Sequence, residues 1–577
     1  MGTLLAVTDD VKQDPKPGAS GAAAWRSRLP GPFRSIANEL PYLGVAGSRS
    51  SALHINSDSG SELASLSGME VRRFATLRYI GTVGSLMIAF GALGAGALPV
   101  VNNPYVAFPG GNLMSRMLQT SSMIVLIGVG LLVLAWVLMA PFTGVSITRR
   151  DSRPARVSIA MLRRTFVAWI APISLTAPMF TQDIYSYLAQ GATVADGLDP
   201  YSGGPLDLLG PDNHLARSVP FIWAHSPSPY GPVALGIAAS ISRITDNSII
   251  AGVYGHRIVS ILGVIAAGWA MAKLARRCRV SPEVAIWLGI LNPLLILHLI
   301  GGIHNESLLL GLMLVGLELG LRAVDAVRVG HWRAAIGMLA ASGFLISCAG
   351  MVKVTGFIAL GFVGMALARE LRARERNSVT ALGVAILIQI VVLVVSVAAV
   401  TVITGVGPGW ISGQGGAATI RSWMSMTTDI GVITGFIGML LGLGDHTTAI
   451  LTVTRSAGVL VAGAFMLRML FATYRGRIHA VGGLGVATFV LVILFPVVHP
   501  WYLLWAILPL SAWANRLFFQ IGVVAYSTAM SFFVLPRGLA LPPGPIFAIY
   551  FGALIGFLLI VALGWGVMRR RQTFGLD

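Results

Sequence analysis

Residues 119–141 read QTSSMIVLIGVGLLVLAWVLMAP and contain no Asp, Glu, Lys or Arg. A helix needs roughly 20 apolar residues to cross the hydrocarbon core of a bilayer, so this run is long enough to span a membrane. Comparable apolar runs recur from residue 77 almost to the C-terminus. In lipid a helix satisfies all of its own backbone hydrogen bonds. The sequence therefore predicts an all-α polytopic membrane protein.

The composition of the 577-residue chain agrees with this prediction. Hydrophobic residues make up 55% of the chain, charged residues only 11%, and the mean hydropathy is +0.77. Soluble domains carry roughly 25% charged residues, which excludes a string of soluble domains. The net charge of +18 does not indicate a nucleic-acid-binding protein, because an excess of Arg and Lys in a membrane protein normally marks its cytoplasmic loops. The two cysteines offer no disulfide framework or CxxC metal site.

The apolar runs predict about 14 transmembrane helices, and the short length of several runs widens the range to about 13 to 16. The candidate spans are residues 77–99, 119–141, 162–180, 249–272, 283–299, 305–322, 333–350, 354–369, 379–404, 449–471, 479–498, 502–515, 518–535 and 546–567.

The distribution of charge predicts the topology. Residues 1–70 hold six Lys or Arg and seven Asp or Glu without apolar periodicity, so we expect a disordered cytoplasmic tail. The positive-inside rule then places both termini in the cytoplasm of a multi-pass plasma membrane protein. It also makes 230–245 and 429–444 interfacial or re-entrant helices. Two long external loops remain, at about 181–248 and 405–428, and the Pro and aromatic content of the first favours an ordered loop.

Asp183 is the first candidate functional residue. It directly follows the apolar run that ends in APMFTQ, so its carboxylate is expected at a membrane boundary, partly desolvated and suited to general-base catalysis. Tyr187 and Gln190 follow at helical spacing and would share one face with it. The alternative is that Asp183 only caps a helix or pairs with an arginine.

Two further polar groups interrupt apolar sequence. His304, Asn305 and Glu306 lie between apolar runs, where they could bind a sugar hydroxyl or a phosphate, or simply begin the next helix. Lys353 has apolar neighbours on both sides. An intramembrane lysine indicates a functional site with an anionic partner, and a lipid-linked phosphate would fit. The alternative is that its side chain reaches back to the interface.

Histidines and aromatic residues gather on the predicted external side. His225 lies in FIWAHSPSPYGP, and His499 precedes Trp501 and Tyr502 in HPWY. Such residues suit sugar rings or lipid head groups, and they also suit the interfacial belt of any membrane protein. Walker A, GxGxxG and HExxH motifs are absent from the sequence. An enzyme of this kind would receive its activated substrate within the membrane.

Three motifs in the first loop carry a family resemblance. DIYSYLAQG (183–191), DPYSGGP (199–205) and SPYGP (228–232) resemble the first external loop of the GT-C membrane glycosyltransferases. The closest likeness is to the polyprenol-phosphate-mannose-dependent α-(1→6)-mannosyltransferases of actinobacterial lipomannan and lipoarabinomannan synthesis. HNE, the Lys353 segment and HPWY fit the same family, and the resemblance covers about residues 160–540.

The resemblance implies a reaction and roles for the candidate residues. Polyprenyl-phosphate mannose would be the donor, a lipid-anchored mannan the acceptor, and the α-linkage would form with inversion. Asp183 would accept the proton of the acceptor hydroxyl, and the departing phosphate would be neutralised by Lys353 together with His304, His499 and Arg421. The residues expected to contact sugar or acceptor are Tyr187, Gln190, Tyr201, His225, Tyr230, Asn305, Glu306, Trp501 and Tyr502.

The sequence departs from the simplest members of that family in two ways. Two predicted spans in 71–160 precede the region 161–577 that resembles the family, and an even number of added spans leaves Asp183 on the external side. Asp183 also lacks a near acidic neighbour in the sequence, so no cofactor is expected and a divalent metal is not supported. The alternative functions are a transporter or flippase of a lipid-linked saccharide, and the same fold acting on another sugar such as arabinose or glucose.

Overall fold

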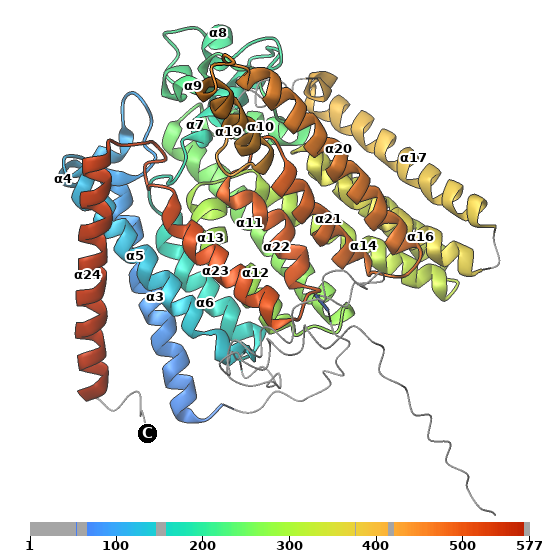
Figure 1. Ribbon diagram of the computed structural model, residues 1–577, viewed down its shortest axis with the longest axis horizontal. Coiled ribbons are helices and arrows are strands. Elements are labelled where there is room, and N and C mark those ends of the chain that lie inside the picture. The colour runs from blue at the N-terminus through green and yellow to red at the C-terminus, as the bar shows by residue number, and fades with distance from the viewer. Residues whose placement is uncertain (1–52, 55–65, 146–156, 375–376, 413–420, 571–577) are drawn as a thin grey trace, which may run out of the picture.

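The computed structural model describes residues 53–54, 66–145, 157–374, 377–412 and 421–570, and every regular element in these ranges is helical (Figure 1). The helices of 13 or more residues are α3 (Gly68–Ala95), α5 (Leu118–Leu138), α6 (Ile159–Ser174), α7 (Asp183–Ala195), α10 (Pro232–Thr245), α11 (Ile249–Arg277), α14 (Glu306–Arg328), α15 (Trp332–Gly350), α16 (Ile358–Ala373), α17 (Ser378–Thr404), α19 (Met426–Leu440), α20 (Thr447–Tyr474), α21 (Ala480–Leu494), α23 (Leu517–Phe533) and α24 (Pro543–Arg570).

Shorter helices connect these elements. They are η2 (Pro104–Ala107), α4 (Gly111–Ser115), η3 (Ala140–Thr143), α8 (Pro205–Leu209), η4 (Ala216–Ser218), α9 (Phe221–Ala224), α12 (Pro282–Gly289), α13 (Pro293–Leu295), η5 (Ile296–Gly301), η6 (Val354–Phe357), η7 (Pro408–Ile411), η8 (Pro500–Leu503) and α22 (Leu504–Ser511).

Nine helices in the described residues are long and apolar enough to span a membrane, and a tenth span results if the bent pair 282–289 and 293–301 is counted as one. These ten correspond to ten of the predicted spans. The other four predictions, 162–180, 479–498, 502–515 and 518–535, coincide with the shorter helices α6, α21, α22 and α23. By length and composition, the described residues therefore match ten of the about fourteen predicted spans, and the other four predictions coincide with helices of fewer than 18 residues.

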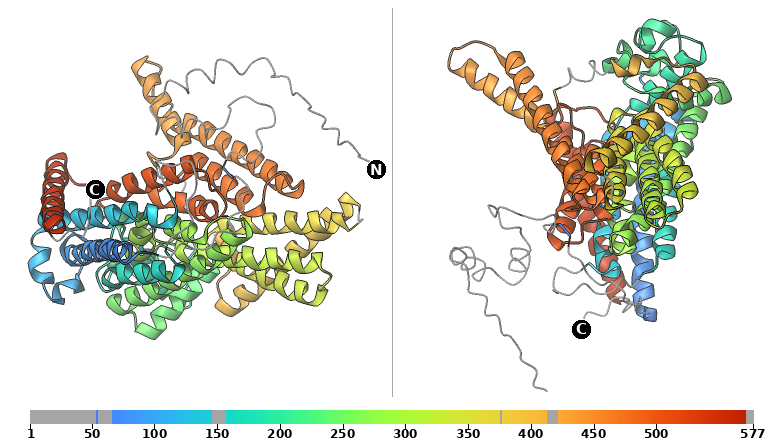
Figure 2. Two further views of the ribbon diagram at one scale, coloured as in Figure 1. Left: turned by 90° about the horizontal axis from the view of Figure 1, so that it is seen from below. Right: turned by 90° about the vertical axis from the view of Figure 1, so that its right-hand side faces the viewer.

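The long helices lie side by side in one bundle, and the short helices of residues 183–245 gather at one of its ends (Figure 1). α24 lies at one edge of the bundle, whereas α17 and α20 lie at the other. α19 and α20 lean away from the remaining helices (Figure 2). The apolar surfaces of α17, α20 and α24 are largely uncovered, which is the condition expected of helices that face lipid.

The centre of the bundle is closely packed. Trp136 of α5 and Trp287 of α12 stack with their ring centroids 5.4 Å apart, and each indole donates a hydrogen bond to the other residue's carbonyl oxygen at 2.8–2.9 Å. Gly263 of α11 faces the backbone of Ser307 in α14, where a Cβ atom would lie only 2.4 Å from a carbonyl oxygen. Small residues at such contacts let membrane helices approach closely.

The first predicted loop, 181–248, is built from α7 to α10, and α7 packs against α10. Most of the predicted tail and residues 413–420 of the second predicted loop lie outside the described residues. Leu53 and His54 are described, and they contact the residues that follow α22. The His54 ring stacks on Trp513 at 5.5 Å, and the Asn515 backbone N–H donates to the Leu53 carbonyl.

Candidate active site

Asp183 occupies the first turn of α7, at the end of the bundle where the short helices gather. One carboxylate oxygen, Oδ1, accepts a hydrogen bond from the indole N–H of Trp223 at 3.1 Å. The other, Oδ2, lies 3.8 Å from Nδ1 of His304. The Asp183 side chain is 24% exposed, whereas that of His304 is 2% exposed. The carboxylate is thus held on one side and remains accessible on the other.

The backbone before Asp183 and before His304 is strained. Phe180 has φ 67° and Ile303 has φ 58°, although neither is a glycine. A β-branched residue such as Ile rarely adopts positive φ, and such strain persists only where the surroundings enforce it. The fully buried guanidinium of Arg257 provides part of that enforcement. It donates to the carbonyl oxygens of Thr176 at 2.6 Å and Ile300 at 3.3 Å, and so ties the two segments together.

Lys353 and Glu306 form an ion pair beside these residues, with Nζ 2.9 Å from Oε1. The ammonium also donates to the Tyr502 hydroxyl at 2.9 Å and lies 5.0 Å from the centroid of the Trp505 ring. Burial opposes the charge on Lys353, but Glu306 and the Tyr502 hydroxyl raise its pKa above the ordinary value. Lys353 is therefore a charged lysine whose anionic partner belongs to the protein itself.

Aromatic rings cover this cluster. The Trp501 ring stacks on His304 at 4.0 Å and on His499 at 4.7 Å. His499 also meets the Tyr502 ring edge-on at 5.1 Å. Burial lowers the pKa of His499 to about 4 and lowers the pKa of His304 below its ordinary value. Both imidazoles are therefore neutral at pH 7 and offer hydrogen bonds rather than positive charge.

Two segments of the first loop, α7 and SPYGP, each contribute a tyrosine hydroxyl close to the cluster. The hydroxyl of Tyr230 lies 3.3 Å from that of Tyr187, and their rings meet edge-on. The SPYGP segment is held in place by the Ser228 hydroxyl, which donates to Gln190 at 3.0 Å. The Tyr201 hydroxyl donates to the Tyr230 carbonyl at 2.9 Å. Gln190 and Tyr201 therefore hold the SPYGP segment in place, Gln190 through Ser228 and Tyr201 through the Tyr230 carbonyl.

Three predicted site residues are placed less centrally. His225 is exposed and pairs with Asp207 at 2.6 Å, and this hydrogen bond lowers the pKa of Asp207. Arg421 is exposed. Its electrostatic neighbours are Asp445, which lies just before α20, and Arg455, which lies on α20. Asn305 is half-buried and is the residue immediately before α14. This is the helix-initiating position that was predicted from the sequence as the alternative to ligand binding.

The structure adds residues that the sequence reasoning missed. Trp223 contacts Asp183 from forty positions along the chain, and Trp505 lies under the Lys353 ammonium. His298 is fully buried and stacks on Trp501 at 4.8 Å. His298 is the single polar residue in 293–303, the apolar stretch before HNE, and this signal is of the kind that identified Lys353. In the described part of the chain, no three His, Cys, Asp or Glu side chains are grouped so as to hold a metal ion.

Asp183, His304, Glu306, Lys353 and the HPWY aromatics thus meet at one end of the bundle, although they come from both halves of the chain. Two family profiles match these halves. The alpha-(1->6)-mannopyranosyltransferase N-terminal domain matches residues 78–369, and the MptB C-terminal domain matches residues 427–562. The chain is 67% identical to alpha-(1->6)-mannopyranosyltransferase B of Corynebacterium glutamicum, over 99% of this chain and 98% of that protein.

The chain belongs to the MptB family. It is also 39% identical to an alpha-(1->6)-mannopyranosyltransferase of Mycobacterium tuberculosis, over 82% of this chain and 84% of that protein. A probable alpha-(1->6)-mannopyranosyltransferase of Mycolicibacterium smegmatis is 41% identical over 81% of this chain and 84% of its own length. No solved structure matches the chain. Membership of the MptB family confirms the predicted mannosyltransferase activity. The protein is thus a hexosyltransferase with alpha-(1->6)-mannopyranosyltransferase activity.

Proposed function

We propose that the protein transfers mannose from polyprenyl-phosphate mannose to a lipid-anchored mannan and forms the α-(1→6) linkage with inversion. The reaction would take place at the end of the bundle that contains Asp183, on the non-cytoplasmic face of the plasma membrane. The mannosyltransferase family supports the sugar, and the absence of nucleotide-binding motifs from the sequence supports a lipid-linked donor.

The observation that carries this proposal is the contrast between the two carboxylates of the cluster. Glu306 is 5% exposed and is neutralised by Lys353, whereas Asp183 is 24% exposed and has no Lys or Arg partner in the described chain. A general base must be ionised and must reach the proton that it accepts. Only Asp183 combines these properties here. Trp223 fixes Oδ1, which leaves Oδ2 to accept the proton of the acceptor hydroxyl.

The donor phosphate would lie beside Lys353. An ammonium group has three N–H donors, and Glu306 and Tyr502 use two of them. The third N–H of Lys353 would bind an oxygen of the departing phosphate. Because His304 and His499 are neutral at pH 7, they would contribute hydrogen bonds to the same phosphate. Arg421 is exposed and has Asp445 and Arg455 as electrostatic neighbours, so we assign it a minor part in this proposal.

The chemistry is then a single in-line displacement. The 6-hydroxyl oxygen of the acceptor mannose forms a bond to the anomeric carbon of the donor, and its proton passes to Asp183. The anomeric C–O bond to phosphate breaks, and its electron pair leaves with the polyprenyl phosphate. A β-linked donor gives an α-linked product by this route. Phosphate is a weak base as a leaving group, so no second carboxylate has to protonate it.

The arginine distribution supports the proposed orientation. The ends of α11, α14 and α16 opposite Asp183 carry Arg277, Arg328 and Arg372, as the positive-inside rule requires of cytoplasmic ends. We propose that the shorter helices α6, α21, α22 and α23 also cross within the bundle, which gives about fourteen crossings in a GT-C-type arrangement with both termini cytoplasmic. Burial between neighbouring helices would allow crossings this short.

The test compares Asp183→Asn with Asp212→Asn. Both carboxylates lie in the first loop, but Asp212 is exposed and remote from the described contacts of the cluster. Purified full-length protein would receive polyprenyl-phosphate [¹⁴C]mannose and a short α-mannoside acceptor. We expect Asp183→Asn to lower the turnover about 10²- to 10⁴-fold, the usual contribution of a general base. Asp212→Asn should leave the turnover unchanged.

Substantial transfer by a correctly folded Asp183→Asn variant would rule out Asp183 as the base. Replacement of the donor by GDP-mannose or by lipid-linked arabinose tests the donor separately. Transfer from the nucleotide sugar alone would contradict the lipid-linked donor, whatever the role of Asp183. Product analysis by NMR tests the linkage and its anomeric configuration.

A further inference from the structure

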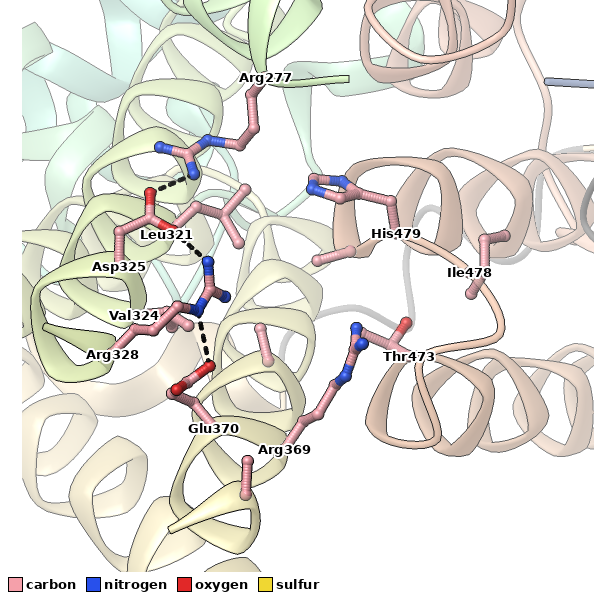
Figure 3. Close-up of a pocket in the computed structure, with 13 residues that line it drawn as sticks. Arg277, Leu321, Val324, Asp325, Arg328, Arg369, Glu370, Thr473, Ile478 and His479 are labelled. Atoms are coloured by element: carbon pink, nitrogen blue, oxygen red, sulfur yellow. Dashed lines mark hydrogen bonds and ion pairs between the residues drawn. The ribbon is translucent and has the colours of Figure 1, made fainter. Parts of the chain in front are cut away.

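A second polar region lies at the opposite end of the bundle from Asp183. A cavity of about 460 Å³ opens there among α11, α14, α16 and the α20–α21 turn (Figure 3). α14 connects the two regions, because Glu306 begins the helix and Arg328 ends it. Its 23 residues span about 35 Å at 1.5 Å per residue. The cavity is therefore about one membrane thickness from the candidate active site.

Carboxylates and arginines form a network along one wall of the cavity. Asp325 accepts from Arg277 at 2.5 Å and from Arg328 at 3.4 Å. Arg328 also contacts Glu370 at 3.1 Å, and Arg277 contacts Glu318 at 3.4 Å. Arg277 and Arg328 thus each share their charge with carboxylates of the protein.

Arg369 is different. It comes from α16 and extends toward the α20–α21 turn in Figure 3, where a Cβ atom at Gly476 would lie 2.6 Å from its guanidinium carbon. Among the described residues, no carboxylate pairs with Arg369, and the titratable group that it faces is His479. The region has more positive than negative charge. Six arginines (Arg277, Arg322, Arg328, Arg369, Arg372 and Arg374) surround three carboxylates (Glu318, Asp325 and Glu370).

The remaining lining is apolar. Leu321, Val324, Ala366 and Ile478 lie beside the charged groups. A guanidinium binds phosphate oxygens through two parallel hydrogen bonds. Basic pockets between transmembrane helices at the cytoplasmic side bind the head groups of anionic lipids. A cavity that offers arginines beside apolar side chains, at the depth where the helices end, suits a phosphate attached to acyl chains better than it suits a free ion.

We propose that this cavity binds the phosphate head group of an anionic membrane lipid, and that Arg369 supplies the charge that the protein leaves uncompensated. The lipid would belong to the leaflet at this end of the bundle, opposite the leaflet that holds the candidate active site. The shared chemistry is a phosphate oxyanion, which inorganic phosphate also presents.

The experiment uses the full-length protein in nanodiscs of phosphatidylcholine, with and without phosphatidylglycerol. Two arginines are compared. Arg369→Gln removes the charge that lines the cavity, and Arg333→Gln removes an exposed arginine at the same end of the bundle that does not line it. Native mass spectrometry counts retained phosphatidylglycerol, and thermal unfolding reports its stabilising effect.

We expect phosphatidylglycerol to raise the melting temperature of the wild type and of Arg333→Gln. Arg369→Gln should lower the apparent affinity for phosphatidylglycerol about tenfold or more, the effect of losing a charge-assisted hydrogen bond. Arg369→Lys keeps the charge without the paired geometry and should fall between the two. Equal responses of Arg369→Gln and Arg333→Gln would overturn the proposal. Stabilisation by inorganic phosphate alone in phosphatidylcholine nanodiscs, lost in Arg369→Gln, would also overturn it and assign the site to free phosphate.

Discussion

The ion pair between Lys353 and Glu306 permits a quantitative test. Lys353→Met removes the ammonium and leaves the Glu306 carboxylate, 5% exposed, without a partner. Removing one member of a buried pair costs about 3–5 kcal/mol of the free energy of unfolding. Adding Glu306→Gln to Lys353→Met removes the stranded charge as well, so the double variant should recover part of that loss. We expect a coupling free energy of about 2 kcal/mol or more between the two positions.

The free energies would come from SDS-induced unfolding of full-length protein in mixed micelles, followed by tryptophan fluorescence. Lys273→Met is the matched control, because Lys273 has no carboxylate partner in the described chain. Its effect should stay within about 0.5 kcal/mol. Additivity of the Lys353 and Glu306 effects to within about 0.5 kcal/mol would refute the argument, because independent sites behave in that way.

The same variants test the proposed phosphate contact. The double variant Lys353→Met with Glu306→Gln lacks the third N–H that we assign to the donor phosphate, whereas Glu306→Gln alone keeps it. A hydrogen bond to a charged group contributes about 1.5–3 kcal/mol, so the double variant should have a kcat/KM about tenfold or more below that of Glu306→Gln. Equal kcat/KM values would show that Lys353 does not contact the phosphate.

Three further outcomes are expected. Trp223→Phe removes the indole N–H that donates a hydrogen bond to Asp183, and it should lower kcat/KM about tenfold without loss of fold. An unchanged kcat/KM would contradict a positioning role for Trp223. Burial lowers the pKa of His479 to about 4 from an ordinary 6.5, so the unfolded state binds more protons and stability falls as the pH decreases between these values. The wild type should lose about 1.5 kcal/mol more than His479→Asn between pH 6.5 and pH 5 in SDS unfolding, and identical losses would contradict this assignment. Gly231→Ala should reduce activity strongly, because its Cβ would lie 2.3 Å from a backbone carbonyl oxygen, whereas Gly203→Ala has room and should retain activity in the same transfer assay.

The sequence predicted the membrane fold because the period and length of apolar runs report directly on spanning helices. The sequence predicted the ends of the helices less accurately than their existence. Residues 502–515 are apolar apart from Tyr502, Ser511 and Asn515, yet in the structure η8 and α22 cover only residues 500–511. The hydropathy of a run does not reveal where a helix ends when the neighbouring loop is also buried. Residues 230–245 and 429–444 were predicted to be interfacial or re-entrant helices from the arginine distribution, and the structure forms helices of 14 and 15 residues there, α10 and α19.

The sequence also identified most residues of the cluster, since polar residues in an apolar run are rare and expensive. It could not give their partners. Lys353 was predicted to bind a lipid phosphate, and nothing in the sequence indicated its ion pair with Glu306, which lies 47 positions away. Trp223 was one of several aromatics in a loop, and nothing in the local sequence distinguishes the one that contacts Asp183. Such pairings depend on the path of the chain between the two residues, and composition carries no information about that path.

The assembly of the site has a consequence for synthesis of the protein in the cell. Tyr502 binds Lys353 from 149 positions further along the chain, and the HPWY segment that covers His304 belongs to the C-terminal family domain. At about 5–20 residues per second, a ribosome needs on the order of 10–30 s to extend the chain from one to the other. During that interval Lys353 and Glu306 are already in the membrane but still lack their aromatic cover. A nascent chain released before HPWY would be an inserted but inactive protein, and truncation there would be expected to attract membrane quality control rather than yield a shorter enzyme.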